Sequence, residues 1–273
     1  MINLLLSIIA SVLIGNLLML FMQDVKSDIF IIFLGNYITA TAFSLARTSG
    51  GFHLLTPFDI GLGCITGLFF LVNFLIYRKN IGVNGLSLSV GVMRISLIIP
   101  TLLAILLFSE RIELSNYLGI GVILLAFVFV TETRTLHNLL WIGLLFVVTG
   151  ISDASLKMFD EWGTGPQEWF VFLIFASAGV WNLGLIFLRK SRFQWRSLGY
   201  GLILGVPNQL TTRFFLASLE DVQAAIAYPL MASGVVVMTI LTDIFFWRKR
   251  FSGKQRISMA LIVAGIVLLN IQR

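Results

Sequence analysis

Residues 61–77 read GLGCITGLFFLVNFLIY, a run without a charged side chain. An apolar segment of roughly 17–25 residues is long enough to cross a bilayer as an α helix. The run is continuously apolar, whereas the strands of a membrane barrel alternate between apolar and polar residues. A helix also forms all its backbone hydrogen bonds within one segment, as a hydrocarbon environment requires. The stretch therefore predicts a membrane-spanning helix over 59–77.

The same pattern recurs along the whole chain of 273 residues. Hydrophobic residues make up 58% of it and charged residues 12%, against roughly 45–50% and about 25% in a soluble domain. A water-soluble core cannot hide this apolar excess, and apolar surface left in water causes aggregation. We therefore predict an all-α integral membrane protein with ten transmembrane helices and no second, soluble domain. The predicted spans are 2–22, 29–46, 59–77, 86–108, 115–131, 138–158, 167–188, 198–217, 223–247 and 255–272.

The distribution of Lys and Arg predicts the orientation of these spans. Residues 2–22 lack a basic leading region and a small-residue cleavage site, so we interpret them as a retained span and not as a signal peptide. The odd-numbered connectors carry 13 basic residues, and the opposite side carries 5. Lys and Arg are retained on the cytoplasmic side. We expect the odd-numbered connectors inside, both termini outside, and the protein in the plasma (inner) membrane of a bacterium.

The two halves of the chain resemble one another. A shift of 139 residues places Arg111-Ile112 on Arg250-Phe251 and residues 118–128 on 257–267 without a gap, and Gly63-x-x-x-Gly67 recurs as Gly201-x-x-x-Gly205. The alternative is that any two apolar hairpins align to some extent. Because five crossings are an odd number, two copies in tandem face opposite ways. We predict two inverted five-helix repeats, 1–131 and 138–273, an arrangement that recurs in secondary transporters.

The hairpin between the fourth and fifth spans carries a short motif, Phe108-Ser109-Glu110-Arg111 followed by Leu118-Gly119-Ile120. It resembles the GER-x(6–8)-G-I hairpin of the drug/metabolite transporter superfamily, in particular its EamA-type members. Other stretches look like recurring segments of that group: Ile99-Pro100-Thr101-Leu102-Leu103, Gly205-Val206-Pro207-Asn208 and Tyr228-Pro229-Leu230. The resemblance implies a ten-helix, two-repeat transporter with a central cavity, but no particular substrate. The second half departs from the pattern, since Lys249 stands at the position equivalent to Glu110.

Arg94 is the deepest charge in the predicted spans, about eight residues and roughly 12 Å into span 86–108. A charge deep in a bilayer costs roughly 2.5–3.5 kcal/mol on insertion scales, and an arginine stays protonated in proteins. We therefore expect Arg94 to face the interior of the helix bundle. There it either anchors a carboxylate or phosphate of a substrate or pairs with an internal acid.

Asp153 and Lys157 share one face of span 138–158 with Gly150. Asp153 is the candidate for proton coupling and also the candidate partner of Arg94. These two roles compete, because a tight ion pair opposes protonation of the carboxylate. Lys157 lies toward the outer end of the span, where it either lines the cavity or extends to the lipid headgroups.

Prolines and amides within the spans supply further candidates. Pro207 and Asn208 lie mid-span, and a proline frees a backbone carbonyl that is best tolerated beside a cavity or a polar partner. We expect helix breaks or gating at Pro100, Pro207 and Pro229. Asn208 either binds substrate or forms an interhelical hydrogen bond. The same two readings apply to the remaining polar candidates: Asn36, Tyr37, Asn182 and Tyr228.

Motifs of catalysis are missing from the sequence: HExxH, GxSxG and the Walker A loop do not occur. We predict no enzyme activity, cofactor, metal site or nucleic-acid binding, and the single Cys64 excludes a disulfide framework. The expected function is a secondary transporter or exporter of a small metabolite by alternating access. Its partners would be the lipid bilayer, the substrate and a coupling ion such as H⁺. Alternatives are a lipid-head-group flippase, an intramembrane lipid-modifying enzyme and a membrane scaffold; substrate, direction and oligomeric state stay open.

Overall fold

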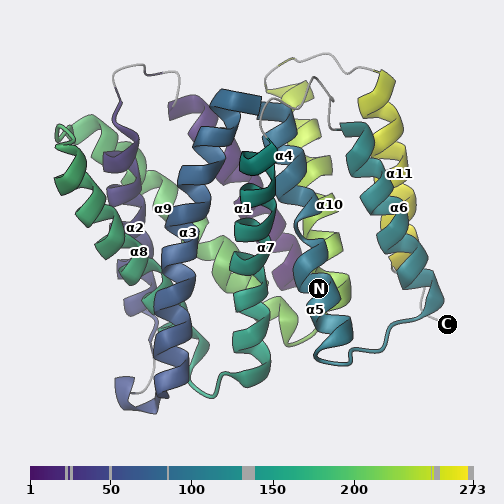
Figure 1. The fold of residues 1–273 in the computed structure, drawn as a ribbon, viewed down its shortest axis with the longest axis horizontal. Coiled ribbons are helices and arrows are strands. Elements are labelled where there is room, and N and C mark those ends of the chain that lie inside the picture. Colours follow the sequence, from purple (N-terminus) through teal and green to yellow (C-terminus); the bar gives the residue numbers. More distant parts are fainter. Residues whose placement is uncertain are drawn as a thin grey trace. The chain divides into compact units, whose positions relative to one another are not determined.

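The computed structural model describes residues 1–21, 24, 27–48, 51–84, 86–130, 139–246, 248 and 253–269. These residues form eleven α helices, one 3₁₀ helix and no strand (Figure 1). The helices are α1 (Ile2–Phe21), α2 (Ile29–Leu45), α3 (Pro57–Asn84), α4 (Leu86–Ile95), α5 (Ile98–Leu106), α6 (Leu114–Val130), α7 (Leu139–Trp162), α8 (Gln167–Arg189), α9 (Trp195–Leu219), α10 (Ala224–Phe245) and α11 (Gly253–Leu269), with the 3₁₀ helix at Phe52–Leu54.

The all-helical prediction is confirmed. Each predicted span overlaps a helix, and the fourth is divided into α4 and α5. Among the described residues, four helices are long and apolar enough to cross a membrane: α3, α7, α8 and α10. The basic connector residues Lys26, Arg134, Lys249 and Arg250 lie outside the described residues.

The predicted connector after residue 77 is wrong, because α3 continues through Arg78 and Lys79 to Asn84. Arg and Lys are good helix formers, so the loss of apolar character does not end the helix. With 28 residues, α3 is roughly 42 Å long at 1.5 Å per residue, more than the roughly 30 Å of a hydrocarbon core. Helix α3 is therefore long enough for its charged end to extend beyond an apolar layer.

The chain folds into two compact units. Unit 1 consists of Met1–Leu71 and Met158–Ser218, and unit 2 consists of Val72–Lys157 and Leu219–Arg273. Each unit thus combines a segment from the first half of the sequence with one from the second half.

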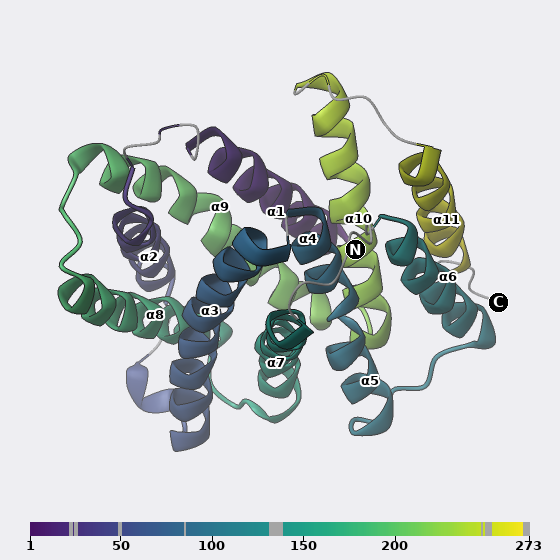
Figure 2. The same ribbon diagram turned by 45° about the horizontal axis from the view of Figure 1, so that its top comes forward.

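In unit 1, glycines bring helices into close contact. Helices α2 and α8 pack together and run in opposite directions (Figures 1 and 2). Gly35 of α2 faces Gly201 of α9 so closely that a Cβ on either would meet the backbone of the other helix. Likewise, a Cβ on Gly67 of α3 would overlap the carbonyl oxygen of Ile174 in α8. The repeated Gly-x-x-x-Gly elements therefore serve as helix–helix contacts, as small residues do where backbones approach each other.

In unit 2, the antiparallel pair α6 and α11 forms the most extensive contact (Figure 1). Ile123 of α6 and Ile262 of α11 are both wholly buried, and Gly265 of α11 lies against Ile123 and the backbone of Gly119. Helix α5 packs against α10. The core of this unit is thus built mostly of apolar side chains and small residues.

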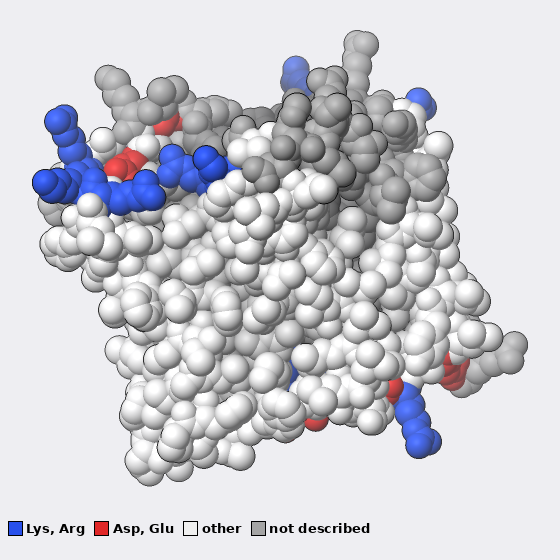
Figure 3. All heavy atoms as spheres, in the orientation of Figure 1, with Lys and Arg blue, Asp and Glu red and all other residues white. Residues whose placement is uncertain are grey.

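Apolar side chains cover much of the outside of the helices. On α8, Val180, Phe187 and Leu188 are 67%, 79% and 80% exposed, while Asn182 is completely buried. Figure 3 shows Lys and Arg gathered over the end of α8 and the start of α9, with uncharged side chains directly below that row. A soluble protein has the opposite arrangement, with large apolar side chains inside and polar groups outside.

Gly201→Ala should lower the thermal unfolding midpoint of the purified protein in detergent. The added Cβ overlaps the Ile32 carbonyl oxygen, and overpacking of this kind costs about 1–3 kcal/mol. Gly199→Ala is the matched control, since a Cβ there meets open space on the same helix; its midpoint should be equal to or higher than that of the wild type. Equal midpoints for the two variants would contradict the tight contact between α2 and α9.

Candidate functional site

A break in the helix positions Arg94. Helix α4 ends at Ile95 and α5 begins at Ile98, four residues after Arg94. Pro100 has no N–H to donate to the carbonyl of Ser96, which instead accepts a 2.9 Å hydrogen bond from the N–H of Ile99. Arg94 consequently occupies the last turn of α4, where a cation interacts favourably with the free carbonyl groups of a helix end.

Arg94 is the charged member of an otherwise apolar pocket in unit 2. The cavity has a volume of about 10 Å³, roughly the space of one water molecule. Its apolar walls come from the start of α5, from α6 and from α10: Leu97, Ile98, Ile120, Ile123, Leu124, Pro229 and Ala232. The pocket thus pairs a fixed positive charge with hydrocarbon walls, which suits an organic anion.

Asp153 of α7 is the nearby acid. Its charge acts on Arg94, but the described residues show no direct ion pair between Arg94 and Asp153. Tyr228 of α10 donates a 2.6 Å hydrogen bond to the backbone oxygen of Asp153. Tyr228 directly precedes Pro229 of the pocket wall, so unit 2 brings Arg94, Asp153, Tyr228 and Pro229 together.

Lys157 has a different environment. It is 3% exposed, and its Nζ lies 2.8 Å from Oε1 of Glu110. The Glu110 carboxylate also accepts hydrogen bonds from the backbone N–H groups of Ala224 (3.1 Å) and Ala225 (2.9 Å). Ser109, with φ of 55°, turns the chain so that Glu110 reaches this helix end. Glu110 therefore caps α10, 114 residues further along the chain, and Lys157 neutralises it.

The other predicted site residues lie in unit 1, where they join helices. Asn208 of α9 donates to Oδ1 of Asn36 in α2 at 3.1 Å, and Asn182 of α8 donates to the backbone oxygen of Phe30 at 3.0 Å. Tyr37 is buried, with its ring 6.1 Å from that of Phe33. For Asn36, Asn182 and Asn208 the structure thus provides interhelical partners, one of the two readings that the sequence left open.

Pro207 and Pro229 do not interrupt their helices, contrary to the predicted breaks; α9 and α10 continue through them. Hydroxyl groups one turn later bond to the carbonyl groups of these prolines. Thr211 donates to the Pro207 oxygen at 2.9 Å, and Ser233 donates to the Pro229 oxygen at 2.7 Å. The carbonyl groups that lose their N–H donors to the prolines are those of Ile203 and Ala225, four residues earlier.

Asp59 is a buried acid that sequence reasoning missed. It forms a reciprocal capping box with Thr56 at the start of α3. Its carboxylate also accepts hydrogen bonds from the backbone N–H groups of Thr164 and Gly165, which precede α8. The spacing Thr56-x-x-Asp59 was the available signal for the cap, whereas the contact with residues 164 and 165 had none.

Removing one partner of the Glu110–Lys157 pair should destabilise the protein. Glu110→Gln removes the carboxylate that pairs with the buried Lys157 ammonium, and breaking a buried pair in this way costs about 3–5 kcal/mol, so the thermal unfolding midpoint should fall. The double variant Glu110→Gln/Lys157→Met should recover part of the loss. Glu113→Gln, at an exposed position in the same hairpin, is the control. Equal midpoints for Glu110→Gln and Glu113→Gln would refute the structural role of the pair.

Comparisons with known proteins extend the fold assignment. No family model matches the chain. An uncharacterized protein of Haemophilus influenzae is 25% identical in an alignment of 240 residues, and the match covers 80% of this chain and 80% of that protein. A solved structure, described as the crystal structure of a protein, has a TM-score of 0.77 and 17% identity, and the match covers 98% of this chain and 97% of the other. The chain therefore shares the fold of that solved protein over nearly its whole length.

Proposed function

We propose that the chain is a secondary transporter of the drug/metabolite type that moves a small organic anion across a bacterial plasma membrane by alternating access. Arg94 carries this proposal, because it is a permanent charge in an otherwise apolar pocket of about 10 Å³ at a helix break. A charge in such surroundings is costly and is typical of a substrate or ion pathway. The proposal assigns no catalytic step and no cofactor to the chain.

Insertion into a membrane is supported by the surfaces of the helices. Exposed leucine, phenylalanine and valine side chains on α8 would face water at a large cost in a soluble protein, but lipid tails solvate them. The long helix α3 and the row of basic side chains at the end of α8 fit a protein whose charged ends meet the headgroups (Figure 3).

An inverted repeat is supported by contacts between related helices. The 139-residue shift relates Ile123 to Ile262, the wholly buried isoleucines of the packed helices α6 and α11. The related segments α2 and α8 also pack, and both pairs are antiparallel (Figure 1). The Gly-x-x-x-Gly element of α3 contacts α8, while that of α9 contacts α2. These are the reciprocal contacts that a two-fold axis between inverted repeats produces.

Alternating access would require the Arg94 pocket to widen, since its present volume fits about one water molecule. The break between α4 and α5 supplies a point at which the helix can bend. Asp153 would provide the coupling: while ionised, its negative charge weakens the attraction of Arg94 for a substrate anion, and its protonation leaves the positive charge of Arg94 available to that anion. On this scheme one proton accompanies each substrate anion.

Reconstitution into liposomes should show saturable uptake of at least one labelled compound from a panel of carboxylates, amino acids and phosphorylated metabolites. Arg94→Ala should reduce that flux at least tenfold, because a charge-assisted hydrogen bond contributes about 1.5–3 kcal/mol. Arg94→Lys should retain part of it, since the charge remains. Arg192→Ala removes an exposed arginine and is the matched control. Flux no greater than that of empty liposomes for every compound, or full flux in Arg94→Ala, would refute the proposal.

Membrane orientation can be measured with single cysteines introduced into a Cys64→Ser background. We expect Glu113→Cys, in the fourth connector, to react with a membrane-impermeant maleimide added to intact spheroplasts. Arg192→Cys, in the seventh connector, should react only after the membrane is permeabilised. Both positions are exposed, so lack of labelling reports sidedness and not burial. The reverse pattern would overturn the predicted orientation. If both cysteines react in intact spheroplasts, or both only after permeabilisation, they lie on the same side of the membrane, and the predicted odd number of crossings between them is wrong.

A further inference from the structure

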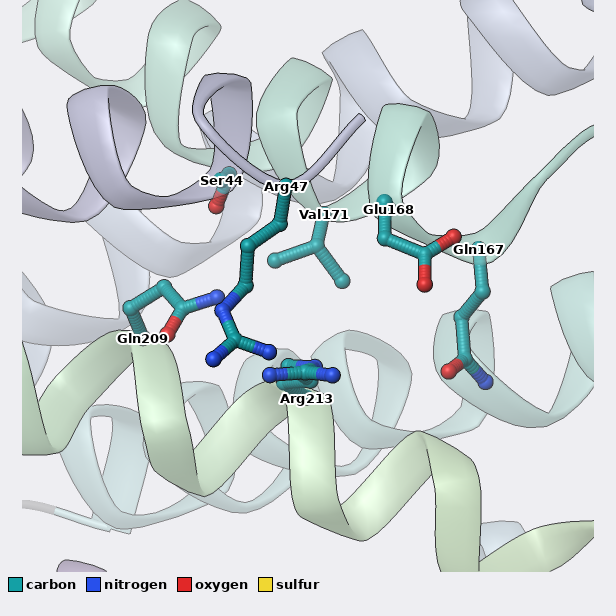
Figure 4. A pocket seen from close by; sticks show the side chains of 7 residues that line it. All are labelled: Ser44, Arg47, Gln167, Glu168, Val171, Gln209 and Arg213. Atoms are coloured by element: carbon teal, nitrogen blue, oxygen red, sulfur yellow. The ribbon is translucent and has the colours of Figure 1, made fainter. Parts of the chain in front are cut away.

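A second pocket with arginines lies in unit 1, among residues that the proposed transport site does not use. Its cavity has a volume of about 10 Å³ and is formed by the end of α2, the start of α8 and the second half of α9. Figure 4 shows the side chains around it: Ser44, Arg47, Gln167, Glu168, Val171, Gln209 and Arg213. All belong to unit 1, so the pocket is complete within one compact unit.

Positive charge dominates this pocket. The guanidinium groups of Arg47 and Arg213 point toward one another (Figure 4), and the charge of Arg47 acts on Arg213. Glu168, in the first turn of α8, is the acid of the lining. The two arginines and this one carboxylate give the pocket lining a net charge of +1. Among the described residues, neither Arg47 nor Arg213 forms a direct ion pair with Glu168. Two like charges held this close repel each other unless an anion lies between them.

Gln209 provides the second observation. It is 2% exposed, lines the pocket, and its Oε1 has no hydrogen-bond partner among the described residues. A buried polar atom left without a partner costs about 1–3 kcal/mol, and such atoms are rare in native proteins. An amide oxygen accepts hydrogen bonds, so Oε1 of Gln209 is available to a donor.

We propose that this pocket binds an oxyanion, a carboxylate or a phosphate, on a ligand that also carries an N–H or O–H donor. Arg47 and Arg213 donate to the oxyanion from opposite sides, and planar guanidinium groups match the oxygens of both anions. Gln209 and Glu168 accept from the neighbouring donor. Arg47 is exposed and its side chain is long, so it can move aside to admit the ligand. The site is independent of the Arg94 pocket and of the proposed transport cycle.

Thermal unfolding with anion titration tests the site directly. The purified protein in neutral detergent is titrated with sodium phosphate or sodium acetate at an ionic strength kept constant with sodium chloride. In a second arm, nanodiscs of phosphatidylcholine are compared with nanodiscs that also contain phosphatidylglycerol. A ligand that binds only the folded state raises the unfolding midpoint saturably. We expect such a rise in at least one arm, with apparent affinity at least tenfold weaker in Arg213→Gln and in Arg47→Gln.

The control is Arg192→Gln, which removes the same charge from an exposed position elsewhere in unit 1 and should leave the titration unchanged. Because Arg47 is exposed, Arg47→Gln tests the site even if Arg213→Gln fails to fold. A response to phosphate or acetate alone identifies a soluble ligand, and one to phosphatidylglycerol alone a lipid headgroup. The proposal is overturned if no arm shows a saturable shift, or if both arginine variants respond as the wild type does, as a general salt effect would.

Discussion

Both units depend on one constraint: a polar group enclosed by apolar helices needs a partner from another helix. Asn182 joins α8 to α2, and Asn208 joins α9 to the same helix. In unit 2, Glu110 joins the α5–α6 hairpin to α7 and α10. Because an unmade hydrogen bond is costly in such surroundings, these contacts fix which helices are neighbours. The glycines of α2, α3 and α9 then allow the backbones to come close enough for short side chains to reach across.

Arg94 departs from this rule. Glu110 and Lys157 neutralise each other at 2.8 Å, whereas Arg94 has an acid within electrostatic range and none in direct contact among the described residues. A structural ion pair would be expected to close fully, since a partly satisfied charge is destabilising. The open arrangement, beside a helix break and hydrocarbon walls, is what makes this arginine the centre of the proposed function.

The segments that become helices could be predicted from apolar run length, because backbone hydrogen bonding in an apolar environment leaves few alternatives. The ends were less predictable: Arg78 and Lys79 lower the hydropathy without stopping α3. Contacts between distant residues had no local signal. The sequence allows either the cavity or the headgroups for Lys157, since no neighbouring residue in the sequence indicates a contact with Glu110 or with the start of α10. The pocket around Arg47 and Arg213 combines residues from three separate segments, so spacing along the chain could not reveal it.

The two units interleave along the chain, since Met1–Leu71 belongs with Met158–Ser218 and Val72–Lys157 with Leu219–Arg273. Synthesis from the N-terminus therefore releases α2 long before α8, its main neighbour, exists. During that interval the buried face of α2, with Asn36 and Gly35, lacks its partners and must be shielded by lipid, by the translocation machinery or by a chaperone. Neither unit is complete until the last third of the chain has emerged, so assembly is expected to follow translation instead of keeping pace with it.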